Sequence, residues 1–188
     1  ALSSINLGVI LQRKGNFNSA EPLIRLGLKV FEKTIGPNHY NTLALVKNLA
    51  DLLKSKKDFA ESRALYQRCF SARERTLGPM HAKTLVCLNR LGIVTTKLGH
   101  LDEAEHHLAQ AYERSLECWG SKDPNTIHVM INLFNCRFLA GTKNLPVEEL
   151  EEGCSWLEQE KGESHEWAKE CRELIAKIKK RAEGESQG

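Results

Sequence analysis

Glycine recurs along this chain at a constant interval of 42 residues. The four glycines of this series are Gly36, Gly78, Gly120 and Gly162. Three of them are followed three positions later by a histidine, at His39, His81 and His165. A period of this length is typical of a repeat array, in which each unit buries its apolar face against its neighbours. Such an array exposes one long surface, so the period favours binding over catalysis.

Apolar residues between the glycines form two helical stripes per repeat. In the second repeat, apolar residues within 43–53 recur at spacings of three and four, which predicts an amphipathic first helix with Thr42 as its N-cap. Asp58 is followed three residues later by Glu61, as in a capping box, so a second and longer helix is expected from there towards Gly78. Each repeat is therefore predicted to be a helix pair.

The fourth repeat and the end of the chain depart from this pattern. Pro146 falls inside the first turn expected for the second helix, where it would remove a backbone donor. We therefore place that helix later, with Asn144 as its cap. Residues 166–181 carry an apolar face with cations behind it, which predicts a helix that caps the array.

The repeat register divides the chain into parts. Because Ala1 aligns with Leu43, inside a helix, we expect the first unit to be truncated and the chain to be a fragment of a longer protein. We predict one array over 1–183, with units at about 1–40, 41–82, 83–124 and 125–163, a cap helix at 164–183, and a disordered tail at 184–188.

Composition and motifs argue against several functional classes. No apolar run approaches the roughly 20 residues that cross a bilayer, and no secretory leader is recognisable, so we expect a cytoplasmic protein without membrane contact. The six cysteines are never closer than 17 residues and form no metal-binding CxxC motif. No phosphate-binding loop, nucleophile elbow or zinc-protease motif occurs. We therefore expect no enzyme activity, no metal and no cofactor.

The junction histidines invite a metal-site interpretation. Because His39, His81 and His165 lie about one repeat apart, they cannot converge in an extended array, and hydrogen bonds that brace the loops explain them better. The period differs from that of helical repeats that read RNA, and no repeated pair of base-reading residues is visible. A nucleic acid partner is therefore not expected.

The residues Leu7, Gly8, Leu11, Ala20 and Ile24 follow a spacing that resembles the tetratricopeptide repeat. The longer period, together with the sequence Leu-Gly-Pro-x-His at the junction, is similar to the repeats of kinesin light chains and their relatives. This resemblance implies an all-α, right-handed helical-repeat solenoid with a C-terminal capping helix. It also implies a non-catalytic adaptor or scaffold for protein–protein interaction, with the first helix of each unit on the concave face.

In the kinesin light chain family, an asparagine just before the Leu-Gly or Leu-Ala pair is implied to hold the backbone of an extended peptide. An amide suits this task because it offers both donors and an acceptor. The matching positions are Asn6, Asn48, Arg90 and Asn132. Asn89 matches the family's second asparagine, and Asn135 is a further candidate on the last of these helices. Alternatively, these amides only satisfy neighbouring helices.

Charged residues gather one helical turn from these positions. The set consists of Arg13, Lys47, Asp51, Lys54 and Lys97, which join Arg90 to give five cations and one anion. This balance predicts a groove for an acidic peptide, although a solvated helix face has the same pattern. The alternative function is a regulatory or oligomerisation module of a larger multidomain signalling protein or enzyme.

Overall fold

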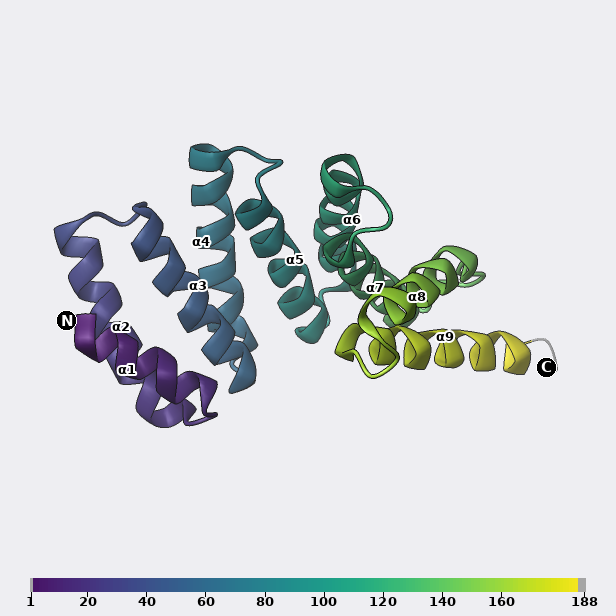
Figure 1. Cartoon of the computed structure of the whole chain (residues 1–188), viewed down its shortest axis with the longest axis horizontal. Helices are drawn as coiled ribbons and strands as arrows, with labels where there is room; N and C mark the ends of the chain where they lie inside the picture. The colour runs from purple at the N-terminus through teal and green to yellow at the C-terminus, as the bar shows by residue number, and fades with distance from the viewer. Residues whose placement is uncertain (1, 186–188) are drawn as a thin grey trace. The chain divides into compact units, whose positions relative to one another are not determined.

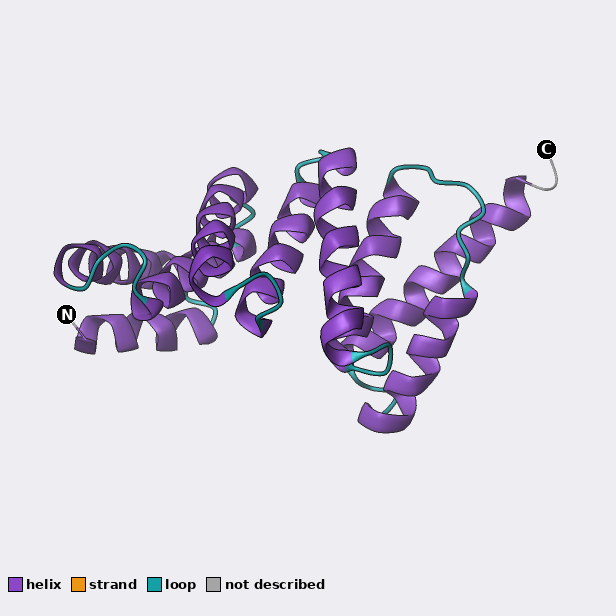
Figure 2. Ribbon diagram, turned by 90° about the horizontal axis from the view of Figure 1, so that it is seen from above, coloured by secondary structure: helices purple, strands orange, loops and turns teal. Residues whose placement is uncertain are grey.

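The computed structural model describes the backbone of residues 2–185 and the side chains of residues 5–184. Within residues 2–185 the regular elements are all helices joined by short loops (Figure 1, Figure 2), which confirms the predicted all-α class. The helices are α1 (Leu2–Arg13), α2 (Phe17–Thr34), α3 (Tyr40–Ser55), α4 (Phe59–Leu77), α5 (Ala82–Lys97), α6 (Leu101–Trp119), α7 (Pro124–Leu139), α8 (Glu148–Lys161) and α9 (Glu166–Glu185).

The helices form two compact units, which are described separately. Unit 1 spans Ala1–Leu98 and holds α1 to α5, and unit 2 spans Gly99–Gly188 and holds α6 to α9. In unit 1 each helix packs against the next one in the sequence. In unit 2, α6 packs on α7 and α7 on α8, while α9 lies against both α7 and α8. Packing between sequence neighbours is what a repeat array requires, because no unit covers its own apolar face completely.

The junction histidines brace the starts of helices. The ring Nδ1 atoms of His39, His81 and His165 each accept a hydrogen bond from a backbone N–H two residues later, at 3.2, 3.1 and 3.3 Å. Asp123 holds the same position before α7, and its carboxylate accepts from two backbone N–H groups. The loop-bracing interpretation is therefore confirmed, and it corrects the predicted start of α3. This helix is capped by His39, not by Thr42, whose buried hydroxyl donates to the carbonyl oxygen of Gly36 at 2.7 Å.

Two boundaries near the end of the chain also differ from prediction. Helix α8 begins at Glu148, and its N-cap position is Val147, so the predicted cap at Asn144 is wrong. Asn144 lies in the preceding loop with φ of 49°, a left-handed conformation that an asparagine accepts more readily than most residues. Helix α9 continues to Glu185 and not only to 183, and the remainder of the predicted tail, 186–188, lies outside the described residues.

Candidate peptide-binding site

Asp51 is the centre of a hydrogen-bonded cluster in unit 1. Its carboxylate accepts a hydrogen bond from Lys47 Nζ at 2.6 Å, one turn earlier on α3, and another from the hydroxyl of Tyr66 on α4. Tyr66 is fully buried, whereas the Asp51 side chain is 22% exposed. The cluster therefore joins the polar side of α3 to the apolar interior between α3 and α4.

The protonation states within the cluster follow from its surroundings. Burial raises the pKa of Asp51, but the charge and hydrogen bond of Lys47, the Tyr66 hydroxyl and the charge of Arg90 together bring it below its usual value. Burial and, as the second largest cause, the charge of Asp51 raise the pKa of Tyr66 far above its usual value. At neutral pH the carboxylate is therefore ionised and the phenol donates to it as a neutral group.

Arg90 supplies a cation to the same region from α5. It is half-buried, and its charge acts on both Asp51 and Tyr66. Within the described part of the chain its guanidinium makes no hydrogen bond and no ion pair. Because Asp51 is already paired with Lys47, the three charges of this region sum to +1. A guanidinium in such a position retains its donors for an incoming carboxylate.

Family models confirm the expected repeat type. Two models of the tetratricopeptide repeat match residues 1–41 and 42–117, which together make up more than half of the chain. The chain belongs to the tetratricopeptide repeat family. Tetratricopeptide repeats are in general scaffolds for protein–protein interaction. No curated protein matches the sequence significantly.

Solved structures share the fold of this tetratricopeptide array. Two crystal structures come from a Podosopora anserina protein that is named after kinesin light chains and has nearly identical TPR-like repeats. Each is 20% identical and covers 98% of this chain and 87% of the other, with TM-scores of 0.81 and 0.79. BtubC (BKLC) from P. vanneervenii is 19% identical over 92% of this chain and 63% of its own, with a TM-score of 0.68. The likeness identifies the fold as a helical-repeat solenoid.

The predicted site residues of this tetratricopeptide array differ in their exposure and in their hydrogen bonds. In unit 1, Asn6, Arg13 and Lys97 are exposed, and Asn48 and Lys54 are half-buried. The backbone carbonyl of Asn48 accepts a hydrogen bond from Gln12 Nε2 at 3.1 Å, whereas its side-chain amide makes no hydrogen bond to a described residue. The amide of Asn48 is therefore available at the surface of α3.

Three predicted amides are placed less favourably. Asn89 is only 6% exposed and is already engaged in an interaction, so its side chain is turned away from solvent. In unit 2, Asn132 donates its amide to the carbonyl oxygen of His128 on its own helix at 2.8 Å. Asn135 is half-buried on the same helix. The structure therefore brings together the polar residues of α3 with Arg90 of α5, but it does not add Asn89 to their surface.

Tyr66 is the member of the cluster that the sequence analysis missed. The other repeats of the tetratricopeptide array have a buried aliphatic residue at its position, namely Ile24, Leu108 and Leu150. Asp51 is also unusual, because two of the other repeats have Val9 and Ile93 there. A hydroxyl and a carboxylate that replace aliphatic residues in one repeat signal a polar contact, since buried polar groups need partners.

The described residues form neither a metal site nor a membrane-spanning helix. Among them, no group of three His, Cys, Asp or Glu side chains is placed to hold a metal ion. Within residues 2–185, no helix has the length and apolar character needed to cross a membrane.

Proposed function

We propose that this tetratricopeptide array is a non-catalytic adaptor or scaffold that binds an extended, acidic peptide segment of a protein partner. The observation that carries this proposal is Arg90, which lies beside the Lys47–Asp51 pair without an ion pair of its own. The excess of one positive charge favours a partner carboxylate, because complementary charge raises both specificity and the rate of association.

The amide of Asn48 is the reason to propose that the peptide binds in an extended conformation. It lies on α3 next to Lys47, and its side-chain donors and acceptor are not used by described residues. An amide pairs with the N–H and C=O of a peptide irrespective of its side chains. Asn48 therefore holds the peptide backbone and Arg90 selects for an acidic side chain.

A binding measurement tests this function. Fluorescein-labelled linear peptides rich in glutamate and aspartate are titrated with the chain, and fluorescence anisotropy is recorded. Arg90→Glu changes the local charge from +1 to −1 and is expected to weaken binding by about 10-fold to 100-fold. Asn48→Ala is expected to weaken it by about threefold to tenfold, because one or two hydrogen bonds are lost.

The matched control is Arg75→Glu, which makes the same charge change at an exposed position on α4 of unit 1. This variant is expected to bind like the wild type. Equal losses for Arg75→Glu and Arg90→Glu would show that only net charge matters, and unchanged binding in Arg90→Glu and Asn48→Ala would refute the proposed site.

The outer face of α1 supports a second candidate function, an oligomerisation module. Leu7 and Ile10 are 50% and 51% exposed. The residues one, two and three periods later are at most 2% exposed; they are Leu49, Leu91 and Leu133 for Leu7, and Leu52, Val94 and Cys136 for Ile10. In unit 2, Leu133 and Cys136 are buried by Ala104 and Leu108 of the preceding helix α6. The exposed face of α1 is therefore shaped to receive a helix of the same kind.

Self-association tests the second candidate. If a second copy covers α1, light scattering is expected to show a mass that rises with concentration, and Leu7→Glu combined with Ile10→Glu is expected to weaken association at least about tenfold. Leu139→Glu is the control, since Leu139 is equally exposed on α7. A wild-type chain that stays monomeric at all concentrations would exclude this function.

A further inference from the structure

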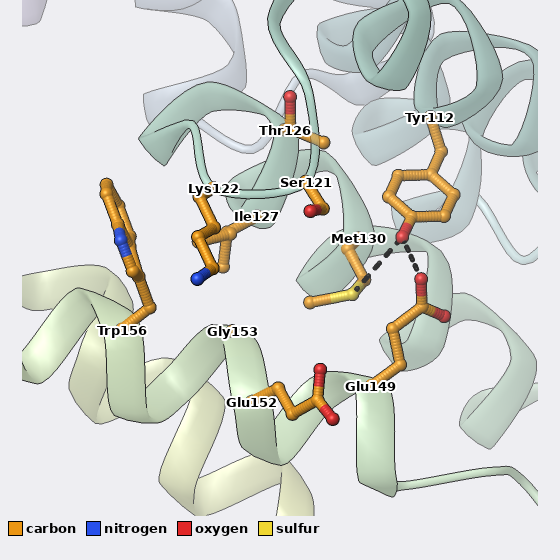
Figure 3. Close-up of a pocket in the computed structure, with 10 residues that line it drawn as sticks. All are labelled: Tyr112, Ser121, Lys122, Thr126, Ile127, Met130, Glu149, Glu152, Gly153 and Trp156. Carbon is orange, nitrogen blue, oxygen red and sulfur yellow. Dashed lines mark hydrogen bonds between the residues drawn. The ribbon is translucent and has the colours of Figure 1, made fainter.

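A small pocket lies within unit 2 between α6, α7 and α8 (Figure 3). Its volume is about 70 Å³. The residues that give it its chemical character are Tyr112 of α6, Lys122 of the loop after α6, Met130 of α7, and Glu149, Glu152 and Trp156 of α8. Asn132 and Asn135, the predicted peptide-binding residues of α7, are not part of it.

The apolar wall of the pocket results from close packing of α8 on α7. Gly153 permits this approach, because a Cβ atom at that position would lie 2.7 Å from the methyl group of Met130 and 3.2 Å from Ile127. Trp156 stands on α8 one turn after Glu152, and Figure 3 shows its indole on one side of the pocket and the Met130 thioether on the other. An indole and a thioether together offer a surface for an alkyl chain.

The charged side of the pocket is fixed by a hydrogen bond. The hydroxyl of Tyr112 donates to the carboxylate of Glu149 and also lies 3.6 Å from the Met130 sulfur. Burial and, as a smaller effect, the hydrogen bond to Glu149 raise the pKa of Tyr112 above its usual value, so the tyrosine stays neutral and donates its proton to this bond. Glu152 is exposed at the same edge and forms no ion pair with a described residue.

The chain itself places a cation in this pocket. Lys122 points its amino group into the space between Trp156, Met130 and Glu152 (Figure 3). It is exposed and forms no ion pair within the described residues, so it is a loosely held occupant. Two carboxylates and one ammonium group leave a net charge of −1, which suits a second or replacing cation.

We propose that this pocket binds a lysine side chain from a basic segment of a protein partner. The alkyl stem of the lysine packs between Trp156 and Met130, and its ammonium group lies between the carboxylates of Glu149 and Glu152. The bound lysine displaces Lys122. This site is independent of the acidic-peptide site of unit 1 and takes a ligand of opposite charge.

The two methionines of the chain make the proposal directly testable. Met130 lines the pocket, and Met80 belongs to unit 1, so a protein labelled with ¹³C at the methionine methyl groups gives one reporter and one internal control. The probe is the acetylated and amidated peptide Gly-Gly-Lys-Gly-Gly, added up to about 10 mM, a range that covers a dissociation constant of about 1 mM. We expect a saturable shift of the Met130 signal and none of the Met80 signal.

Three variants separate this site from an unspecific charge effect. Glu152→Gln is expected to weaken peptide binding by about threefold to tenfold, whereas Glu160→Gln, an exposed position on the same helix that does not line the pocket, leaves it unchanged. Lys122→Ala removes the competing ammonium and is expected to strengthen binding by about twofold to fivefold. Circular dichroism confirms that each variant is folded.

Several outcomes would overturn the proposal. They are an unmoved Met130 signal, equal effects of Glu152→Gln and Glu160→Gln, or weaker binding in Lys122→Ala. An equal shift with the glutamine peptide Gly-Gly-Gln-Gly-Gly would show that charge plays no part. An equal shift with the corresponding arginine peptide would refute the assignment to lysine.

Discussion

Replacement of Asp51 by alanine is expected to lower the free energy of unfolding of unit 1 by about 3 kcal/mol. The substitution leaves the fully buried hydroxyl of Tyr66 without its acceptor and removes the counter-charge of Lys47. It also leaves the charge of Arg90 without the carboxylate on which it acts. Urea denaturation followed by circular dichroism measures the loss, and hydrogen exchange of α3 and α4 shows where it occurs.

A double-mutant cycle distinguishes the hydrogen bond from simple truncation. Tyr66→Phe keeps the buried ring and the Lys47–Asp51 pair, so it is expected to cost only about 1 kcal/mol. Asp51→Ala combined with Tyr66→Phe is expected to cost at least about 1 kcal/mol less than the sum of the single changes, because one variant already breaks the shared bond. Strictly additive effects would contradict the cluster.

Acid provides an independent test of the same cluster. The pKa of Asp51 in the folded chain lies below its ordinary value of 3.8. The stabilisation by its ionised form is therefore fully present above that value and is lost as the pH falls through the lowered pKa. The difference in stability between the wild type and Asp51→Ala is expected to stay constant from pH 8 to about pH 5 and to shrink below about pH 4.

Arg73→Ala is expected to destabilise unit 1 by a similar amount, about 3 kcal/mol. Arg73 is only 6% exposed on α4, and its guanidinium donates to the carbonyl oxygen of Lys83 at 3.1 Å and to Cys87 Sγ at 3.2 Å. Alanine leaves a cavity and removes both hydrogen bonds of the guanidinium beside the Cys69 and Cys87 sulfur atoms, which lie 3.2 Å apart. Denaturation and exchange of α4 and α5 measure the effect.

A substitution of Arg73 that keeps the side-chain volume but removes the charge shows whether packing or charge causes the loss of stability. Arg73→Met keeps most of the side-chain volume and removes a buried charge whose desolvation is costly, so it is expected to stay within about 1 kcal/mol of the wild type. Two of the other three repeats support this expectation, because Phe31 and Leu157 occupy the position one period before and two periods after Arg73. If methionine costs as much as alanine, the charge itself stabilises the fold and the expectation is wrong.

The sequence was sufficient to predict most of the helical architecture, because period and capping act locally. The 42-residue interval and the apolar spacing gave the order of the helices, and Asp58 caps α4 by accepting from the backbone N–H of Glu61 at 3.3 Å, as expected. The predicted start of α3 is wrong because a histidine ring nitrogen provides the cap there, and histidine is not one of the residues preferred at N-caps. The start of α8 depends on how the loop around Asn144 closes, which no short pattern encodes.

The candidate site was predictable only where its geometry lies within one helix. Lys47 and Asp51 are four residues apart and meet as that spacing requires. Asn89 and Arg90 are adjacent on α5, so their side chains point about 100° apart, and Asn89 is buried while Arg90 is only half-buried. Tyr66 comes from another helix, and its contact with Asp51 depends on how α3 and α4 pack. The spacing of residues along the sequence does not predict such contacts between two helices.

Packing between helices that are neighbours in the sequence determines where local unfolding begins. In unit 1, helix α1 packs mainly on α2 and α5 packs mainly on α4, whereas α2, α3 and α4 each pack on the helix before and the helix after them. The stability of such a structure is a sum of terms between adjacent elements and not the property of one shared core. Local melting is therefore expected to begin at α1 and to leave the Asp51 cluster between α3 and α4 folded, so that the proposed peptide site outlasts the loss of the first helix.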